Sequence, residues 1–409
     1  MSRNEPPPTP PKSLPDVCVR CATCMAACPV SRVTPHFPGP KQAGPGAQRF
    51  RSASEASVDD WIELCTACRL CDTVCPAGVP ISELNLLAKA KFLDERGRTF
   101  RDWLLVRSDW FGELAARFSF IVNPLMKNRA VRWLLDTLLK IDRRRELPAY
   151  EYPTFRQWFR TRLDAPSPEG RPRIGYFHGC FTNTNEVDVG RAAVALLEAY
   201  GYAVEVPPQR CCGIPRLGVG DLRGGREMGT RNLSLLLPAV RQGIDIVFSS
   251  TSCGLMLRHE YDRTLGLPGA AELAEHLFDI CDWLLRLHQE GKATVTFRPL
   301  HVKAAYFAPC HLKSLNIGLP ALELVRLVPG LSVRLIEADC CGLGGLYGFK
   351  TEKYAIAEEI GKDLAQAVSR IDPDLILTDC EGCRMQLRAL TGLEVLHPVQ
   401  FLRDALPTG

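Results

Sequence analysis

Two cysteine motifs near the N-terminus share the spacing Cys-x2-Cys-x2-Cys-x3-Cys-Pro. Three thiolates at this spacing can wrap a loop around three irons of a cube, while the fourth, followed by proline, leaves toward a second cube. The spacing therefore predicts two [4Fe–4S] clusters that relay single electrons and perform no bond chemistry on an organic substrate. Tetrahedral zinc is the alternative, and the repeat of one spacing over eight cysteines favours iron. The predicted ligand sets are Cys18, Cys21, Cys24 and Cys75 for one cluster, and Cys65, Cys68, Cys71 and Cys28 for the other.

Further cysteines recur in register along the C-terminal part of the chain, at an offset of 129 or 130 residues. An adjacent pair is awkward for one tetrahedral ion, because neighbouring side chains diverge, and it suits a larger, irregular iron–sulfur cluster. A Cys-x2-Cys pair adds two chelating thiols to the second copy. The second copy holds Cys310, Cys340, Cys341, Cys380 and Cys383, and the first holds Cys180, Cys211, Cys212 and Cys253.

The first copy lacks one thiol, because Ser250 stands where a partner to Cys380 would fall. A serine alkoxide replaces a thiolate poorly on iron, so we expect a cluster in the second copy and leave the first open. Zinc, a redox dithiol or buried thiols remain alternatives. Cys281 has no counterpart and is expected to be a core thiol. His178 and His311 lie beside cysteines, and we expect core histidines rather than ligands there.

The composition bounds the protein classes that remain. The chain has 409 residues, 18 cysteines and a net charge of +4 spread along its length, which gives no support for nucleic-acid binding. No apolar run is long enough to predict a membrane-spanning helix. The polar start, Met1 to Lys12, does not resemble a signal peptide, so we expect the chain in the reducing cytosol, where cysteines serve as ligands rather than disulfides.

The segments that position the cysteines divide the chain into five parts. We expect a disordered lead over residues 1–17, a helical two-cluster ferredoxin-type domain over 18–97, an amphipathic helical linker over 98–165, and two duplicated α/β halves over 170–295 and 300–409. Within the ferredoxin-type domain, Pro35 to Pro45 predicts a loop or turn series and residues 81–95 predict a helix.

Residues 99–145 alternate apolar and basic side chains and predict amphipathic helices that are interrupted at Pro124 and end in the basic cluster Arg143, Arg144 and Arg145. These helices either pack on the neighbouring domain or dock on a membrane or a partner subunit, since basic amphipathic helices lie in lipid interfaces.

Short β-like runs alternate with helical patterns in each half, which predicts parallel sheets. The cysteines follow these runs, and open α/β sheets bind ligands at the carboxyl ends of their strands. The runs cover 174–177, 202–206 and 244–248 in the first half, and 302–307, 332–336 and 375–377 in the second.

Together these motifs resemble the CCG-domain iron–sulfur proteins, which include heterodisulfide reductase subunits, and within them the C subunits of anaerobic glycerol-3-phosphate dehydrogenases. The resemblance runs from about Asp16 to the C-terminus. It rests on the two ferredoxin motifs and on Ala27-Cys-Pro-Val-Ser-Arg-Val33, Pro38-Gly-Pro-Lys-Gln-Ala-Gly-Pro45, Phe177-His-Gly-Cys-Phe181, Ser249-Ser-Thr-Ser-Cys253, Cys340-Cys-Gly, Tyr347-Gly-Phe-Lys350 and Thr378-Asp-Cys-Glu-Gly-Cys383.

The resemblance implies a subunit with no catalysis of its own. It would accept electrons from flavin-containing catalytic subunits that oxidise sn-glycerol 3-phosphate, pass them to menaquinone, and hold those subunits peripherally at the cytoplasmic face of the inner membrane. No nucleotide or flavin site is expected in this chain, which lacks a GxGxxG fingerprint. The alternatives are the iron–sulfur subunit of glycolate oxidase and a heterodisulfide-reductase-like catalytic subunit that cleaves a disulfide.

Overall fold

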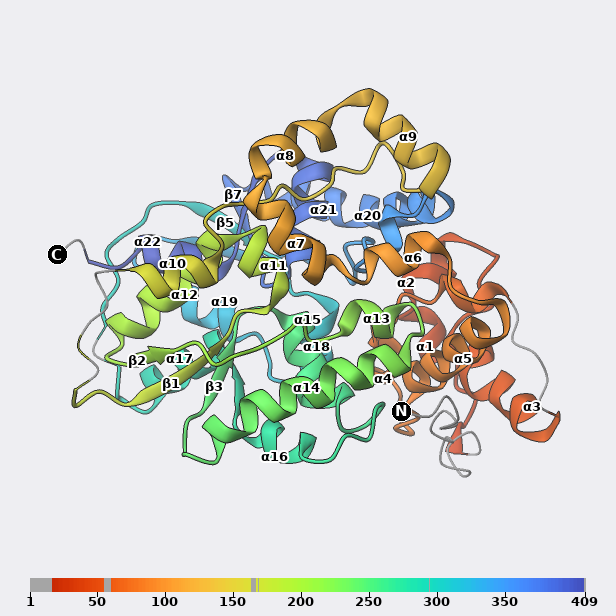
Figure 1. The fold of residues 1–409 in the computed structure, drawn as a ribbon, viewed down its shortest axis with the longest axis horizontal. Coiled ribbons are helices and arrows are strands. Elements are labelled where there is room, and N and C mark those ends of the chain that lie inside the picture. The colour runs from red at the N-terminus through yellow and green to blue at the C-terminus, as the bar shows by residue number, and fades with distance from the viewer. Residues whose placement is uncertain (1–16, 55–59, 163–166, 168, 294, 408–409) are drawn as a thin grey trace.

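A computed structural model describes residues 17–54, 60–162, 167, 169–293 and 295–407. It confirms the predicted fold class, a helical ferredoxin-type domain followed by two α/β halves (Figure 1). Apart from its last residue, the lead predicted over residues 1–17 lies outside the described residues, as does the end of the linker predicted over 98–165.

The ferredoxin-type domain is built from short helices and contains no strand among its described residues. Its two cysteine loops have the same backbone shape, with left-handed φ angles at Arg20 and Ala22 in the first and at Ala67 and Arg69 in the second. This conformation is rare outside glycine, so each loop is held tightly by its surroundings. The elements are α1 (Thr23–Ala26), α2 (Pro29–Val33), η2 (Gln42–Gly46), α3 (Ala47–Ser54), η3 (Asp60–Leu64), α4 (Leu70–Thr73) and α5 (Ile81–Arg96).

The segment predicted as a loop over Pro35 to Pro45 turns helical at its end, and this part of the prediction was wrong. The π-helix η2 contains Pro45 and packs on α5. A Cβ at Gly44 would lie 2.8 Å from Ile81 Cγ2, so the small residue permits the close approach. Glycine and proline indicate the end of a helix only where tertiary packing does not offset their low helix propensity.

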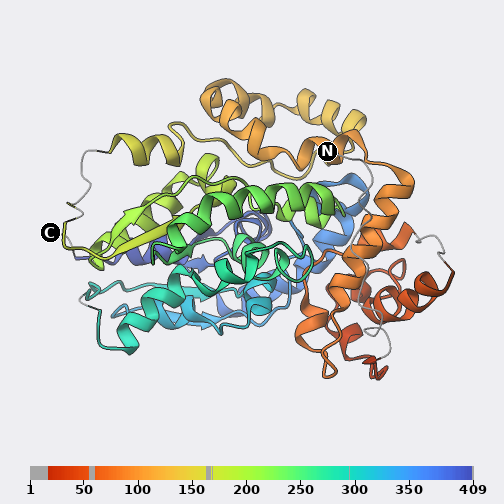
Figure 2. The ribbon, with the colours of Figure 1, turned by 60° about the horizontal axis from the view of Figure 1, so that its bottom comes forward.

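The predicted amphipathic helices form a layer at the outer edge of the molecule, as Figures 1 and 2 show for α8 and α9. The predicted interruption at Pro124 was wrong, since Pro124 lies inside α8. Asn123 anchors that helix by exchanging two hydrogen bonds with the backbone of Tyr150, at 2.8 and 2.9 Å. The elements are α6 (Phe100–Leu105), α7 (Ser108–Arg117), α8 (Ser119–Lys127), α9 (Arg129–Leu139) and α10 (Phe155–Thr161).

The predicted basic cluster at the end of this segment is not a free surface patch. Arg145 is buried and donates hydrogen bonds to Gln386, Glu358 and the carbonyl of Gly348 in the second α/β half. Arg144 forms an ion pair with Asp142 at 2.6 Å. Arg145 therefore fastens the helical layer to the second half.

The first α/β half contains a parallel sheet in the order β2-β1-β3-β4, with Ile174 opposite Val204 and Tyr176 opposite Val247. The fourth strand, absent from our prediction, has only three residues, Leu277–Asp279, and continues directly into the helix that begins at Ile280. The elements are β1 (Arg173–Phe177), α11 (Gly179–Thr184), α12 (Val187–Ala199), β2 (Ala203–Glu205), α13 (Ile214–Gly218), α14 (Leu222–Val240), β3 (Ile246–Phe248), α15 (Thr251–Leu255), η4 (Met256–Glu260), α16 (Ala270–Glu275), β4 (Leu277–Asp279) and α17 (Ile280–Gln289).

The second half repeats this topology in the order β6-β5-β7-β8, again with all strands parallel. Its fourth strand was also missed in our prediction and is equally short. The elements are β5 (Lys303–Tyr306), α18 (Cys310–Leu315), α19 (Pro320–Val325), β6 (Ser332–Leu335), η5 (Tyr347–Phe349), α20 (Thr351–Ile371), β7 (Leu375–Leu377), α21 (Glu381–Thr391), β8 (Glu394–Leu396) and α22 (Pro398–Asp404).

The two halves share one apolar core. Helix α12 packs on α22, and α17 packs on α19, so each half covers the other with its own helices. The buried faces of these helices include Leu197, Leu284, Leu324 and Leu402, each contributing about 1.5–3 kcal/mol by burial. A second contact joins α15 to α18, the helices that carry Cys253 and Cys310. The duplicated thiol sites are therefore neighbours.

A buried ion pair fastens the ferredoxin-type domain to the first half. Arg69, between two cysteines of the second motif, donates to both carboxylate oxygens of Glu260, with Nη2 to Oε2 at 2.7 Å. The Arg69 and Glu260 side chains are only 7% and 2% exposed, and Thr264 accepts a further hydrogen bond from Arg69 at 3.3 Å. The pair holds the Cys65–Cys75 loop against η4.

We expect Glu260→Gln to destabilise the folded protein by about 3–5 kcal/mol, because the variant removes the buried bidentate carboxylate and leaves the Arg69 charge only the longer contact with Asp72 at 3.4 Å. Glu272→Gln is the matched control, since it breaks an exposed pair with Arg241, and its stability should stay close to that of the wild type. Urea unfolding of anaerobically purified protein measures both. Equal losses in the two variants would contradict a structural role for the buried pair.

Candidate functional site

The duplicated cysteines gather at the carboxyl edge of each sheet, as predicted. In the first half, Cys180 follows β1, the Cys211-Cys212 pair follows β2 and Cys253 follows β3. These three strands are adjacent in the sheet, so their carboxyl ends meet at one place. The second half repeats the arrangement with Cys310 after β5, Cys340 and Cys341 after β6, and Cys380 and Cys383 after β7.

The sulfur atoms within each half lie close together. Cys180 Sγ is 3.7 Å from Cys211 Sγ, and Cys341 Sγ is 3.3 Å from Cys383 Sγ. Hydrogen bonds from Cys340 and Cys383 lower the pKa of Cys341 to about 5. Bonds from Cys180 and Cys212 lower the pKa of Cys211 well below its usual value. In each half, hydrogen bonds from neighbouring thiols therefore stabilise a thiolate, which is the form that ligates metal.

The N-terminal cysteines of the first predicted set surround one small cavity. Its volume is about 20 Å³, and Cys75 lines it together with three thiols from the first loop, Cys18, Cys21 and Cys24. The contact between α1 and α4 places the two motifs side by side. The structure thus brings together four thiols that the crossover pattern assigns to one cluster.

The thiols of the second predicted set also interact with one another. The pKa of Cys71 is raised well above its usual value, first by burial, then by the charge of Asp72, and further by Cys68, Cys65 and Cys28. Cys28 and Cys65 belong to one apolar cluster, which also includes Cys340 of the second half. This set therefore lies in the interior, next to the duplicated thiols.

A cavity of about 660 Å³ connects the ferredoxin-type domain to both halves. Ser314 spans this junction, since its hydroxyl donates to the carbonyl of Cys310 at 2.9 Å and to that of Cys68 at 3.3 Å. The cavity is lined by thiols from all three parts of the chain: Cys65, Cys68, Cys180, Cys211, Cys212, Cys253, Cys310, Cys340, Cys341, Cys380 and Cys383.

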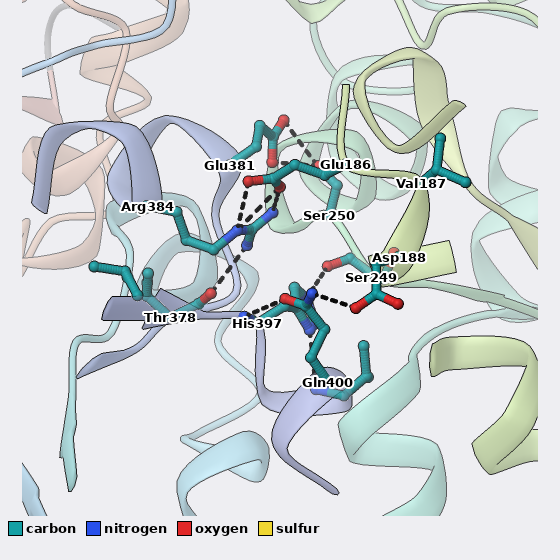
Figure 3. A network of polar contacts seen from close by, with 12 residues as sticks. Glu186, Val187, Asp188, Ser249, Ser250, Thr378, Glu381, Arg384, His397 and Gln400 are labelled. Carbon is teal, nitrogen blue, oxygen red and sulfur yellow. Dashed lines mark hydrogen bonds and ion pairs between the residues drawn. The ribbon is translucent and has the colours of Figure 1, made fainter. Parts of the chain in front are cut away.

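Ser250, which stands in place of a thiol, is engaged elsewhere. Its hydroxyl donates to the two carboxylate oxygens of Glu381 at 3.0 and 3.1 Å, and its oxygen accepts from the amide of Cys253 at 3.3 Å as the N-cap of α15. Figure 3 shows Ser250 and Glu381 facing each other across the two halves. The first half therefore has one thiol fewer than the second, and Ser250 instead caps α15 and binds the Glu381 carboxylate.

The same network ties the halves together through buried charges. Arg384 donates to both carboxylate oxygens of Glu186 and to the carbonyl of Thr378, at 3.0 Å for the last (Figure 3). Burial raises the pKa of Glu381, and the Arg384 charge opposes this shift. His397 contacts the carbonyl of Ser249 at 2.7 Å. Each half therefore depends on the other for the satisfaction of its buried polar groups.

Cys281, which has no counterpart in the other half, lies in different surroundings from His178 and His311. Cys281 is fully buried in the core shared by the halves. His178 and His311 line the large cavity, where burial lowers their pKa values to about 3 and 4. Both rings already contact other groups: His178 accepts from Arg156 at 3.4 Å, and His311 meets the Ser252 hydroxyl at 3.0 Å. They are neutral histidines within the packing.

The sequence reasoning missed several polar side chains in the cavity wall. Lys89, Lys353 and Tyr347 line it and are buried, although none carries a ligand motif. The one available signal was Lys89, a cation within the apolar run Leu86-Leu-Ala-Lys-Ala of a predicted helix. Tyr347 stood only in the motif Tyr347-Gly-Phe-Lys350, which marked the family and no site. Lys353 gave no signal, because only the tertiary contact between α20 and the ferredoxin-type domain buries it.

We expect Ser250→Ala to lower stability by about 1–3 kcal/mol, because it removes one hydrogen-bond donor from the buried Glu381 carboxylate and removes an N-cap. The pKa of Glu381 should rise further in this variant, since the Ser250 hydrogen bond lowers it. Ser234→Ala, at an exposed serine of α14, is the control. Urea unfolding measures both variants, and a Ser250→Ala protein as stable as the control would show that the hydrogen bond contributes nothing.

Comparisons with known protein families match these parts of the chain. Residues 15–79 match the 4Fe-4S dicluster domain. Residues 174–258 and 304–388 each match the cysteine-rich CCG domain, so both halves are copies of one family. No helix within the described residues is both long and apolar enough to cross a membrane.

Similar whole chains are found in several organisms. The B subunit of the fumarate reductase (CoM/CoB) of Methanothermobacter marburgensis is 26% identical, over 94% of this chain and 70% of its own length. The probable glycolate oxidase iron–sulfur subunit of Bacillus subtilis is 24% identical, over 91% and 88%. The C subunit of the anaerobic glycerol-3-phosphate dehydrogenase of Escherichia coli K12 is 37% identical, over 95% and 98%. The chain is an iron–sulfur protein that belongs to the family of anaerobic glycerol-3-phosphate dehydrogenase C subunits.

Proposed function

We propose that this chain is the electron-transfer subunit of an anaerobic sn-glycerol-3-phosphate dehydrogenase complex, with no catalysis of its own. The observation that carries the proposal is the run of thiols from the surface cavity at Cys21, through the buried set at Cys68, to the cavity that reaches Cys310. Such a run suits a relay between partners. The relationship to a C subunit over nearly the full length supports the choice of complex.

Two ligand sets for [4Fe–4S] clusters follow from the spacing and the grouping of the thiols. Cys18, Cys21, Cys24 and Cys75 form the exposed site, and Cys28, Cys65, Cys68 and Cys71 form the buried site. When bound, such clusters supply one-electron transfer. The protein's contribution is to hold the loops in their left-handed turns and to bury Cys28 and Cys71 of the second set.

A further cluster is proposed in the second half, on Cys310, Cys340, Cys341, Cys380 and Cys383. The first half has only Cys180, Cys211, Cys212 and Cys253, because Ser250 is held by Glu381. We therefore propose dithiol or thiol chemistry rather than a full cluster there. About twelve irons per chain would agree with this assignment, and about sixteen would contradict it.

The partners we propose are flavin-containing catalytic subunits as electron donors and menaquinone as the acceptor. Reduction of a quinone to a quinol consumes two electrons, drawn here from glycerol 3-phosphate, and two protons from water. The large cavity could admit a lipophilic acceptor, since part of its wall is apolar, with Leu104, Phe111, Val122, Met126 and Leu135. These side chains come from α6 to α9, the outer helical layer.

The outer face of that layer supports peripheral docking on the cytoplasmic face of the membrane. While the inner sides of α7, α8 and α9 line the cavity, their outer sides expose large apolar groups, with Trp110 71% and Phe120 73% exposed. Exposed cations lie among them, as expected for a helix layer on anionic lipid. The apolar groups are Trp110, Leu114, Phe118, Phe120, Ile121, Leu125, Trp133, Leu134 and Leu138, and the cations include Arg117, Lys127, Arg129 and Lys140.

The electron-transfer proposal predicts that flavin partners and glycerol 3-phosphate together reduce the clusters of the purified chain under anaerobic conditions. Low-temperature EPR with iron and sulfide analysis measures this. In Cys75→Ala, about four irons and only the signal of the exposed cluster should be lost, because Cys75 crosses over to the first motif.

Cys281→Ala is the matched control, at a buried cysteine outside every proposed ligand set, and should keep its full iron content. Clusters that stay oxidised beside an active flavoenzyme would contradict the relay. Reduction by a glycolate-oxidising flavoenzyme instead would point to the alternative complex.

The docking proposal predicts that Trp110→Asp, Phe120→Asp and Leu138→Asp together abolish co-sedimentation with phosphatidylglycerol vesicles, because three apolar contacts are replaced by anions. Leu327→Asp with Leu335→Asp is the control, at exposed leucines of the second half. Iron content should be unchanged in both. Equal membrane binding by the triple variant and the wild type would place the membrane contact elsewhere.

A further inference from the structure

Two buried lysines flank the second cysteine set. Lys89 of α5 donates to the carbonyls of Cys65 and Gly218, the latter at 2.9 Å, and Lys353 of α20 donates to the carbonyl of Glu63 at 2.7 Å. The two residues are 7% and 4% exposed. Among the described residues, no carboxylate forms an ion pair with either ammonium. Burial disfavours an unpaired ammonium and lowers the pKa of both lysines, so a bound group of negative charge would stabilise their charged form.

Two uncharged donors point to the same place. The amide of Asn85 donates to Cys65 Sγ at 3.7 Å. The hydroxyl of Tyr347 is buried and has no hydrogen-bond partner among the described residues, while the Lys353 ammonium lies 5.2 Å from its ring centroid. Tyr347 lines the large cavity together with Cys65, and a Cβ at Gly344 would lie 3.1 Å from both Tyr347 Cβ and Thr66 Cγ2, so the segment of Tyr347 passes close to the Cys65 loop. A partnerless buried hydroxyl fits a site where an acceptor binds.

Two of the buried negative groups near this set are already paired. Asp72, next to Cys71, accepts hydrogen bonds from Ser82 and lies 3.4 Å from Arg69, and Glu260 pairs with the same arginine. Lys350, also buried, pairs with Asp102 at 2.8 Å. Glu63 acts on both lysines, but it is exposed, so its charge is screened by solvent. Lys89 and Lys353 are therefore buried cations beside the set that no carboxylate of the described residues pairs.

The first cysteine set has different surroundings. Cys21 is exposed and its sulfur lies 3.3 Å from the Thr23 hydroxyl, while Cys75 Sγ accepts from the amide of Val79 at 3.4 Å. Lys41 lines this small cavity but is not buried. Its charge is screened by solvent, so the first set lacks the buried cations of the second.

We propose that Lys89, Lys353 and Tyr347 give the buried cluster the higher reduction potential of the two, so that electrons enter at the exposed cluster and move inward. This inference rests on the ligand sets proposed above. Positive charge and hydrogen bonds to sulfur favour the reduced cluster, which carries one more electron. Burial alone acts in the opposite direction, because a low dielectric disfavours added charge. The order of the potentials therefore measures which effect is larger.

An EPR-monitored redox titration of the full chain tests the inference. In the wild type, the buried cluster should be reduced at the higher potential. Tyr347→Phe and, independently, Lys353→Met should each lower the reduced-to-oxidised ratio of that cluster at a set potential about tenfold, which is about 59 mV for a one-electron couple. The exposed cluster should not shift. Cys75→Ala, which lacks the exposed cluster, assigns the two signals.

The matched controls are Tyr354→Phe and Lys362→Met, both in α20, the helix that carries Lys353. Tyr354 packs under Arg144, whose Cζ lies 4.1 Å from its ring centroid, and Lys362 pairs with Glu359 at the surface. Both controls should titrate as the wild type does. A higher potential at the exposed cluster, or unchanged potentials in Tyr347→Phe and Lys353→Met at full iron content, would overturn the inference. Loss of both signals from Cys75→Ala would instead contradict the ligand sets.

Discussion

Parallel pairing of adjacent strands is the constraint on which the thiol sites of the two halves depend. Because β2, β1 and β3 run in the same direction, the segments that leave their carboxyl ends start from one edge of the sheet. Cysteines from three distant parts of each half are thereby brought within a few ångströms, with Cys180 and Cys211 at 3.7 Å between sulfurs. An antiparallel neighbour would carry its cysteine to the opposite edge.

The sites are neighbours because the domains are fastened by buried polar contacts rather than by apolar packing alone. Arg69 and Glu260 hold the second cysteine loop on the first half, while Ser314 touches the backbone on both sides of the junction with the second half. Arg145 does the same for the helical layer. These contacts are directional, so they fix distances between the thiol groups that an apolar interface would leave less specific.

The duplication has become asymmetric at one position with consequences in both halves. Ser250 replaces a thiol, and its hydroxyl serves the buried carboxylate of Glu381, which belongs to the cysteine motif of the other copy. This hydrogen bond joins residues of different halves, so neither half could form it alone. The sequence revealed the substitution, and the contact across the halves explains what the serine does.

The sequence by itself determined the cysteine spacing, the duplication, the alternation of strands and helices, and the family. These are local or periodic properties, readable without knowing which segments meet. It did not predict the fourth strands, which lie directly before a helix, or the helical end of the segment after Pro35, where Gly44 packs against Ile81. It misplaced the break at Pro124, because a contact with Tyr150 holds the helix together.

Only the tertiary structure decided which charges are buried near the thiols. Lys353 lies far along the chain from Cys65, and nothing in its neighbours marks it as an interior residue. It is buried because α20 packs against the ferredoxin-type domain. Arg143, Arg144 and Arg145 look alike in sequence, yet Arg145 is an interior residue and Arg143 is exposed. The environment of a charge depends on what folds against it, and this is a property of the whole chain.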